Sequence, residues 1–264
     1  MVSRIRIGLG LLWVVVGLSL LVPWLYLGMR TGLYEPWRIR RWCHSLILRA
    51  LGFRVHVHGA LAPQRPLLVA SNHISWTDVM VLASFNNVSF IAKSEMAGWP
   101  LIGWLTRLQR CVFVERDRRR KSGAQASEIA SRLAAGDAMV LFAEGTTGDG
   151  NLILPFKSTL FGAAELAIGE GDVDRVFIQP VAVGYTRLQG LPMGRQHRAV
   201  AAWIGDQDLV PHLKDLLAEG AIDVEVHFGE PIEFSAGSSR KETARRVEER
   251  VRTMMNKALR DPRR

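Results

Sequence analysis

Cysteine is scarce in this sequence: the 264 residues include only Cys43 and Cys111, which lie far apart and form no CxxC pair. A disulfide framework requires paired cysteines, and a structural zinc site requires clustered cysteine or histidine ligands, so neither is indicated. The sequence also lacks a P-loop, a GxGxxG stretch and the GxSxG stretch that marks the nucleophilic serine of many hydrolases. We therefore expect no metal ion, no cofactor and no serine nucleophile, and a catalytic body that faces a reducing compartment.

Acidic residues are fewer than basic ones, 25 against 34, which gives a formal net charge of +9. Such an excess suits an anionic partner, for example lipid headgroups, an acidic carrier protein, a phosphorylated cofactor or nucleic acid. A nucleic-acid-binding protein is one reading of this charge. The sequence contains no recognisable nucleic-acid-binding motif and carries an apolar segment that such a protein does not need, so we expect no nucleic acid partner.

Charge is missing altogether from residues 7–29, a run that would form a helix about 34 Å long at about 1.5 Å per residue, enough to cross or deeply enter a bilayer. The run is too long for the apolar part of a cleaved signal peptide, and no small-x-small cleavage site follows it. Residues 34–51 then mix arginines with tryptophans and leucines, as basic helices at membrane surfaces do.

Arginine is more abundant after the apolar run than before it, and the positive-inside rule therefore favours a cytoplasmic body. We predict a membrane-anchoring segment at residues 1–52 and a catalytic domain at residues 53–264. The expected location is the inner membrane, with the catalytic domain facing the cytoplasm. A spanning helix and a re-entrant hairpin both stay open, and the hairpin would put the N-terminus on the same side as the body.

Short apolar segments alternate with helix-like segments from residue 53 onward. The expected strands are 54–57, 67–71, 88–92, 111–114, 138–142, 176–183 and 222–228, and the expected helices are 77–85, 100–108, 121–135, 156–168 and 238–259. Strands separated by helices predict an α/β fold with a mixed, largely parallel sheet flanked by helices, in which sites form where strands end.

The first candidate site is the segment 72–78, Asn-His-Ile-Ser-Trp-Thr-Asp, which begins where an apolar strand ends and leads into a helix. Asp78 falls in the first helical turns, from which its carboxylate can fold back onto the imidazole of His73. It would then fix the tautomer whose other ring nitrogen can act as a base. A hydroxyl needs such a base, whereas a thioester is already an activated acyl donor and needs no nucleophilic serine. The alternative is that the polar residues of this segment only cap the helix.

The second candidate site is the segment 142–150, which contains Glu144, Gly145, Thr146 and Asp149 at the end of another apolar strand. Glycines let backbone NH groups approach a ligand, and a glutamate at a strand end can bind acceptor hydroxyls. An ordinary glycine-rich turn is the alternative. A third candidate, the segment 112–121, follows a strand and offers cations for a headgroup or a carrier. A solvated charged run is the alternative for residues 118–121.

These elements together resemble the glycerolipid acyltransferase family that includes the 1-acylglycerol-3-phosphate acyltransferases, over about residues 54–185. Four motifs occur in the family's order, each at a strand end, which makes the resemblance specific. The matching residues are His73 and Asp78 of an NHxxxxD motif, residues 112–116 ending in Arg116, the EGT motif Glu144-Gly145-Thr146, and residues 178–182 with Pro180.

The resemblance implies an O-acyltransferase that moves a fatty acyl group from a thioester of acyl carrier protein or coenzyme A to the hydroxyl of a lysolipid at a membrane. It implies that His73 deprotonates the acceptor hydroxyl and that Asp78 orients His73. It also implies that Arg116 and the EGT motif contact the acceptor and that the Pro180 segment shapes the acyl pocket.

One departure from the family pattern follows the EGT motif. Members with a phosphate-bearing acceptor usually continue EGT with an arginine, whereas residues 147–151 here read Thr-Gly-Asp-Gly-Asn. Bacterial lyso-ornithine lipid acyltransferases resemble this region, and their acceptor carries a free amine and a carboxylate, which Asp149 and Arg116 could bind. We predict that lyso-ornithine lipid is favoured. The alternatives are acylation of lysophosphatidic acid to phosphatidic acid and a non-catalytic lipid-binding membrane protein.

Two histidines, His56 and His58, share one face of the first expected strand, a spacing compatible with a metal. No third ligand is evident from the sequence. Exposed strand side chains are therefore the favoured interpretation.

Overall fold

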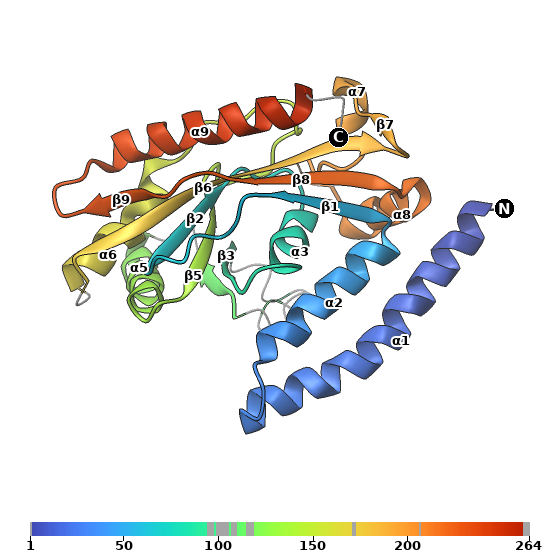
Figure 1. Ribbon diagram of the computed structural model, residues 1–264, viewed down its shortest axis with the longest axis horizontal. Coiled ribbons are helices and arrows are strands. Elements are labelled where there is room, and N and C mark those ends of the chain that lie inside the picture. The colour runs from blue at the N-terminus through green and yellow to red at the C-terminus, as the bar shows by residue number, and fades with distance from the viewer. Residues whose placement is uncertain are drawn as a thin grey trace.

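A sheet to which the described residues contribute nine strands forms the centre of the computed structural model (Figure 1). The structure describes residues 2–93, 98, 106, 110–114, 119–170, 173–205 and 207–260. The strands are β1 (Phe53–His58), β2 (Leu67–Ser71), β3 (Ser89–Lys93), β4 (Val112–Val114), β5 (Ala138–Phe142), β6 (Arg175–Leu188), β7 (Leu191–Pro192), β8 (Ile222–Phe228) and β9 (Ile232–Ser235). Their order is β1-β8-β6-β2-β5-β3-β4, and β7 and β9 pair with β6.

The mixed, largely parallel sheet predicted from the sequence is confirmed. Strands β6, β2, β5, β3 and β4 run parallel, β8 is antiparallel to β6, and β1 is parallel to β8. All five residues of β2 are buried between β5 and β6. A strand buried on both faces needs an unbroken apolar run, which accounts for its sequence Leu-Leu-Val-Ala-Ser.

Helices cover both faces of the sheet (Figure 1). Helix α9 (Arg240–Arg260) covers one face of β6, where Ala258 lies 3.8 Å from the position of a Cβ on Gly184. Helices α2 (Pro36–Ala50) and α3 (Thr77–Ala83) lie on the opposite face, where Thr77 contacts the next β6 residue, Tyr185. Further helices among the described residues are α5 (Arg119–Ala134), η2 (Ser158–Phe161), α6 (Gly162–Glu170), α7 (Arg195–Arg198) and α8 (Leu209–Glu219).

The N-terminal helix α1 (Val2–Thr31) forms an antiparallel hairpin with α2, and its tip points away from the sheet (Figure 1). Residues Ile5–Thr31 are long and apolar enough to cross a membrane by length and composition. Close approach of the two helices depends on Gly17, because a Cβ there would lie 2.3 Å from the Cδ1 atom of Leu46.

The beginning of α1 docks on the body of the protein through Arg6. Its Nη1 atom donates a hydrogen bond of 3.0 Å to the carbonyl oxygen of Glu219 at the end of α8. The guanidinium lies against Gly52 and Gly220, and a Cβ on Gly220 would lie 1.0 Å from Arg6 Nη2. The start of α1 therefore lies against the end of α8 and the turn that leads into β1.

Several elements differ from the sequence-based expectation. The helix expected at 156–168 begins instead as the 3-10 helix η2 and continues as α6, because Phe156 N is bound by the Glu248 carboxylate and Lys157 N by the carbonyl of Ala143. Strands β7 and β9 and helices α7 and α8 were not predicted. The helix expected at 100–108 falls almost wholly outside the described residues, and the domain boundary at residue 52 stays a prediction.

Candidate active site

The loop that carries His73 leaves the sheet at the end of β2, where the side chain of Asn72 extends the pairing with β6. Asn72 Nδ2 donates to the carbonyl oxygen of Val183 at 2.9 Å, and Val183 N donates to Asn72 Oδ1 at 2.8 Å. A primary amide offers both a donor and an acceptor, so it takes the place of a backbone peptide group. This pairing fixes the point from which His73 departs.

The predicted contact between His73 and Asp78 is present. His73 Nδ1 lies 2.9 Å from Asp78 Oδ2, and the same oxygen accepts hydrogen bonds from the backbone NH groups of Ile74 and Ser75 at 2.7 and 2.9 Å. Asp78 is completely buried, whereas the His73 side chain is 19% exposed. Because the carboxylate accepts hydrogen bonds, we assign the proton of His73 to Nδ1, which leaves Nε2 as the basic nitrogen.

Tyr185, which the sequence analysis did not single out, holds the other carboxylate oxygen. Its hydroxyl donates to Asp78 Oδ1 at 2.6 Å and lies 2.6 Å from Thr77 Oγ1, which serves as the donor in that pair. Burial, together with the charge of Asp78, raises the pKa of the Tyr185 hydroxyl well above its ordinary value, so the hydroxyl keeps its proton. A chain of hydrogen bonds from α3 to β6 therefore fixes the carboxylate that orients His73.

The imidazole of His73 is also fixed from its face. It stacks on the ring of Phe142, the last residue of β5, with 3.9 Å between centroids and an interplanar angle of 13°. The backbone NH of Gly148 donates to the carbonyl oxygen of His73 at 2.8 Å. The end of β5 and the glycine-rich loop after it thus hold the histidine loop, which joins the first two predicted sites into one.

Glu144 lies directly after β5 and is 2% exposed. Burial raises the pKa of its carboxyl to about 8, the negative charge of Asp78 adds to the rise, and the NH groups of Leu154 and His73 oppose it. Among the described residues, its Oε2 atom has no hydrogen-bond partner. A buried carboxyl beside a histidine–aspartate pair, with one oxygen unsatisfied, is a typical feature of a binding site.

Gly145 must stay small. It has a φ of +72°, and a Cβ there would lie 2.9 Å from Lys157 Nζ. The Lys157 side chain therefore crosses directly over the loop next to Glu144, while Thr146 is exposed. A side chain at position 145 would displace this lysine.

Asp149 is held by its own loop. Its Oδ1 atom accepts from the NH of Asn151 at 2.9 Å and from that of Leu152 at 3.4 Å, and its Oδ2 atom accepts from Asn151 Nδ2 at 3.1 Å. Burial would raise the pKa of its carboxyl, but these hydrogen bonds outweigh that effect and lower the pKa. Arg198 donates to Asn151 Oδ1 at 2.9 Å, which adds a cation that the sequence analysis missed.

Pro180 is buried in the interior of β6, paired with Ala70 of β2. Its carbonyl oxygen accepts from Gly229 N at 2.9 Å, at the point where the antiparallel neighbour of β6 changes from β9 to β8. The position that lacks an NH group therefore falls between the segments of β6 that pair with β9 and with β8, where the loss of a ladder hydrogen bond destabilises the sheet little. Its expected role in the acyl pocket stays a prediction.

Arg116 lies outside the described residues.

Of the two histidines of β1, His56 is exposed, as interpreted from the sequence, whereas His58 is partly buried. His56 Nε2 lies 2.8 Å from the Oδ1 atom of Asp223, and His58 contacts Glu225. His227 approaches the same glutamate. No third ligand was evident from the sequence, because these carboxylates belong to β8, which is distant from β1 in the chain but pairs with it in the sheet.

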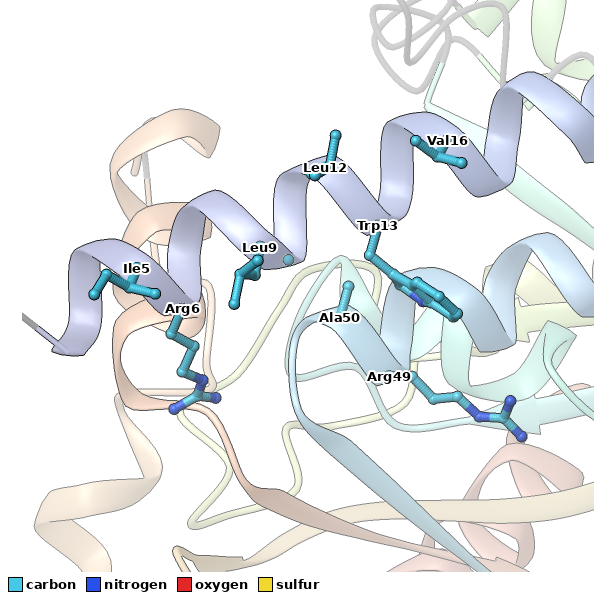
Figure 2. Close-up of a pocket in the computed structure, with 9 residues that line it drawn as sticks. Ile5, Arg6, Leu9, Leu12, Trp13, Val16, Arg49 and Ala50 are labelled. Atoms are coloured by element: carbon cyan, nitrogen blue, oxygen red, sulfur yellow. The ribbon is translucent and has the colours of Figure 1, made fainter.

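An apolar groove lies between α1 and α2, and its lining residues all belong to these two helices (Figure 2). Figure 2 shows Trp13 of α1 pointing toward Ala50 and Arg49 at the end of α2, and Leu9 and Leu12 lie on the same stretch of α1. The groove belongs to the hairpin alone, so it forms part of the expected membrane surface.

Comparison with known proteins agrees with this geometry. A family model described as acyltransferase matches residues 54–184. A lyso-ornithine lipid O-acyltransferase of Brucella abortus is 52% identical over 262 residues, which cover 98% of this chain and 97% of that protein. The chain belongs to the acyltransferase family.

More distant matches of this acyltransferase cover less sequence or show the fold alone. A 1-acyl-sn-glycerol-3-phosphate acyltransferase of Neisseria meningitidis is 36% identical over 120 residues, 45% of this chain and 47% of that protein. The crystal structure of a 1-acyl-sn-glycerophosphate acyltransferase from Thermotoga maritima covers 98% of both chains with a TM-score of 0.65 at 20% identity. The family resemblance and the fold predicted from the sequence are thereby confirmed.

Proposed function

We propose that this acyltransferase is a lyso-ornithine lipid O-acyltransferase, which moves a fatty acyl group from an acyl thioester to the free hydroxyl of lyso-ornithine lipid. The relative of that name from Brucella abortus matches nearly the whole chain, including the hairpin and the loop after the EGT motif. The observation that carries the chemistry is the pair of His73 and the fully buried Asp78 at the end of β2.

In the proposed reaction, His73 Nε2 removes the proton of the acceptor hydroxyl while the hydroxyl oxygen attacks the thioester carbonyl. The carbon–sulfur bond breaks, and the leaving thiolate takes the proton back from the imidazolium. Asp78 stabilises the imidazolium and keeps its orientation, since Nδ1 remains bound to Oδ2 throughout. Acyl carrier protein and coenzyme A thioesters both supply this chemistry, so the assay includes each as the donor.

Glu144 is the proposed anchor for the acceptor. Its unsatisfied Oε2 atom can accept a hydrogen bond from a substrate hydroxyl or amide, and such a bond would compensate for the burial of the carboxyl. Gly145 and Thr146, which follow it, would line the same region, with Lys157 crossing above the loop.

The charge of the following loop favours an acceptor that carries an ammonium group. Asp149 lies between Gly148, which is bound to the His73 carbonyl, and Gly150, where a Cβ would be 3.3 Å from Ile74. A carboxylate held this close to the histidine loop would repel a phosphate by about 1–4 kcal/mol at about 4 Å and would attract an ammonium group. Arg116 would then bind the acceptor carboxylate.

The test measures acyl transfer to lyso-ornithine lipid and to lysophosphatidic acid with the same enzyme preparation. Wild-type protein should prefer the ornithine acceptor, and Asp149→Asn should lower kcat/KM for that acceptor alone. Asparagine is a matched replacement, because its Oδ1 atom can still accept from the NH groups of Asn151 and Leu152. Thr147→Arg should improve use of the phosphate acceptor. If Asp149→Asn changed kcat/KM equally for both acceptors, Asp149 would only stabilise the turn and would not select the acceptor.

Lysophosphatidic acid is the second candidate acceptor, supported by the relative from Neisseria meningitidis and by Arg116, which could serve a phosphate. If the wild-type enzyme acylates it at least as fast as lyso-ornithine lipid, the charge argument fails and this alternative replaces it. A protein that acylates neither acceptor with either donor would be a lipid-binding protein without catalysis.

The hairpin is proposed to lie within the inner membrane, with the catalytic domain on the cytoplasmic side. Helix α2 packs along α1 and carries Arg38, Arg40, Arg41 and Arg49, so a spanning α1 would draw arginines into hydrocarbon at about 2.5–3.5 kcal/mol each. A hairpin in one leaflet keeps the arginines at the headgroups and the apolar side of α1 among acyl chains. Because Arg6 holds the start of α1 on the body, an α1 that crossed the membrane would carry Leu33 to the outer face. An impermeant thiol reagent applied outside intact spheroplasts should therefore label Leu33→Cys if α1 spans the membrane and should fail to label it if the hairpin lies in one leaflet.

A further inference from the structure

Three potential metal ligands meet on the face of the sheet that α9 covers. His58 ends β1, and Glu225 and His227 lie on the neighbouring strand β8. The parallel register places His58 opposite His227. In β8, Glu225 and His227 point to one face and Val226 to the other, because side chains alternate along a strand.

The reactive atoms of these side chains converge. The Nε2 atoms of His58 and His227 both approach Glu225 Oε2, the latter at 3.6 Å, and all three ligand atoms lie within 4.8 Å of one another. The two imidazoles are stacked, with 4.3 Å between centroids and an interplanar angle of 18°. Glu225 is 9% exposed and the histidines are 26% and 14% exposed, so the cluster is sheltered from water.

We propose that His58, Glu225 and His227 bind a divalent transition metal ion, with Zn²⁺ as the best fit to two imidazoles and a carboxylate. Tetrahedral zinc with bonds of about 2.0–2.2 Å places its ligand atoms about 3.4 Å apart, close to the observed His227–Glu225 distance. Small side-chain movements would therefore form the site. Three protein ligands leave a fourth position for water.

A neighbouring histidine–carboxylate pair on the same strands serves as a comparison, because it contains one histidine and one carboxylate. His56 and Asp223 form a single hydrogen-bonded pair at 2.8 Å. In the cluster, by contrast, two imidazole nitrogens approach one carboxylate oxygen. A carboxylate oxygen can accept a hydrogen bond from each imidazole, and two imidazole nitrogens that converge on one carboxylate oxygen are also a ligand set that a metal ion binds.

The ion would have a structural role and no part in acyl transfer. Tyr185, which binds Asp78, lies on the face of β6 opposite to Gly184, and Gly184 pairs with Glu225. The cluster and the histidine–aspartate pair therefore lie on opposite sides of the sheet. The ion would join the ends of β1 and β8, and β1 is the edge strand that follows the membrane hairpin.

The experiment uses the full-length protein in detergent, purified without a polyhistidine tag and treated with a chelator. Titration with Zn²⁺ should reveal one equivalent bound, and zinc at about 100 times Kd should raise the Tm by about 5–10 °C. Replacing zinc by Co²⁺ should give the intense visible absorption of a tetrahedral site.

The variants separate this site from adventitious zinc binding. His58→Ala and His227→Ala should each weaken zinc binding at least 10-fold and abolish the zinc-dependent rise in Tm. His56→Ala, the matched control on the same face of β1, should bind zinc as the wild type does. The readout is the difference between zinc-loaded and zinc-free samples of one variant, so a change in its basal stability does not affect it.

Two results would overturn the proposal. One is wild-type protein that binds no stoichiometric zinc. The other is zinc binding that persists unchanged in both His58→Ala and His227→Ala. Acyl transfer by the zinc-free wild type should continue, and its loss would contradict the structural role assigned to the ion.

Discussion

Replacing Glu144 by glutamine probes the buried carboxyl at the end of β5. Burial raises the pKa of this carboxyl from its ordinary 4.5 to about 8. Between these pH values the unfolded chain has released a proton that the folded protein still holds. The group's contribution to stability is therefore complete below pH 4.5, falls as the pH rises toward 8, and stays constant above it.

The structure sets the size of the effect. Each pH unit within this window lowers the free energy of unfolding of the wild type by about 1.4 kcal/mol, or by up to about 5 kcal/mol over the whole window. Glutamine does not titrate and has the same shape, so Glu144→Gln escapes this loss. At about 2–4 °C per kcal/mol for a protein of this size, the difference in Tm in favour of the variant should grow by about 3–6 °C per pH unit.

The assay is thermal unfolding of the detergent-solubilised proteins in steps from pH 5 to pH 9. Glu242→Gln, an exposed change in the first turn of α9, serves as the control and should differ from wild type by a constant amount. The two curves for Glu144→Gln and wild type should meet near pH 5 and separate up to pH 8. A constant difference would refute the assignment of a buried, protonated Glu144, whatever the effect on activity.

The other predictions concern the histidine–aspartate pair and the docking of α1. His73→Ala should lower turnover by about 100-fold to 10,000-fold while circular dichroism and Tm stay close to wild type, and near-normal turnover would remove His73 from the base role. Tyr185→Phe should cost about 1–3 kcal/mol in a denaturant melt, because Asp78 Oδ1 loses its buried donor, with a smaller loss of turnover than Asp78→Asn. Gly220→Ala should destabilise the protein by about 1–3 kcal/mol and expose the start of α1 to protease, since the φ of Gly220 is +51° and a Cβ there would overlap Arg6. Arg6→Ala should expose the start of α1 to protease without the backbone strain. If α1 stayed protected from protease in both variants, the docking of α1 would be contradicted.

The contacts of the candidate site were predictable because they are local. Asp78 folds back onto His73 from the first turn of α3, and Glu144 follows a run of buried residues, so both positions can be read from short stretches of sequence. The apolar run of β2 likewise identifies a strand buried on both faces. In these places local pattern and tertiary structure agree.

The contacts that escaped prediction join distant parts of the chain. Tyr185 binds Asp78 across 107 positions, and Arg6 binds Glu219 across 213. His58 meets Glu225 across 167 positions, through a strand pairing that the apolar pattern of β1 and β8 does not specify. The alternation of β6 could have placed Tyr185 on one face of the sheet, but not its partner on α3.

The amide pairing of Asn72 with Val183 has a consequence for the interpretation of mutations in the NHxxxxD motif. The buried side chain of Asn72 continues the strand pairing by one residue, so its amide groups are used in holding the turn after β2. Aspartate has the same shape but cannot donate to the Val183 carbonyl, so it would leave that oxygen facing a negative charge. Loss of activity in Asn72→Asp would therefore indicate that the His73 imidazole is misplaced. Crystals of this variant should show the turn after β2 shifted, with His73 and Asp78 both still present.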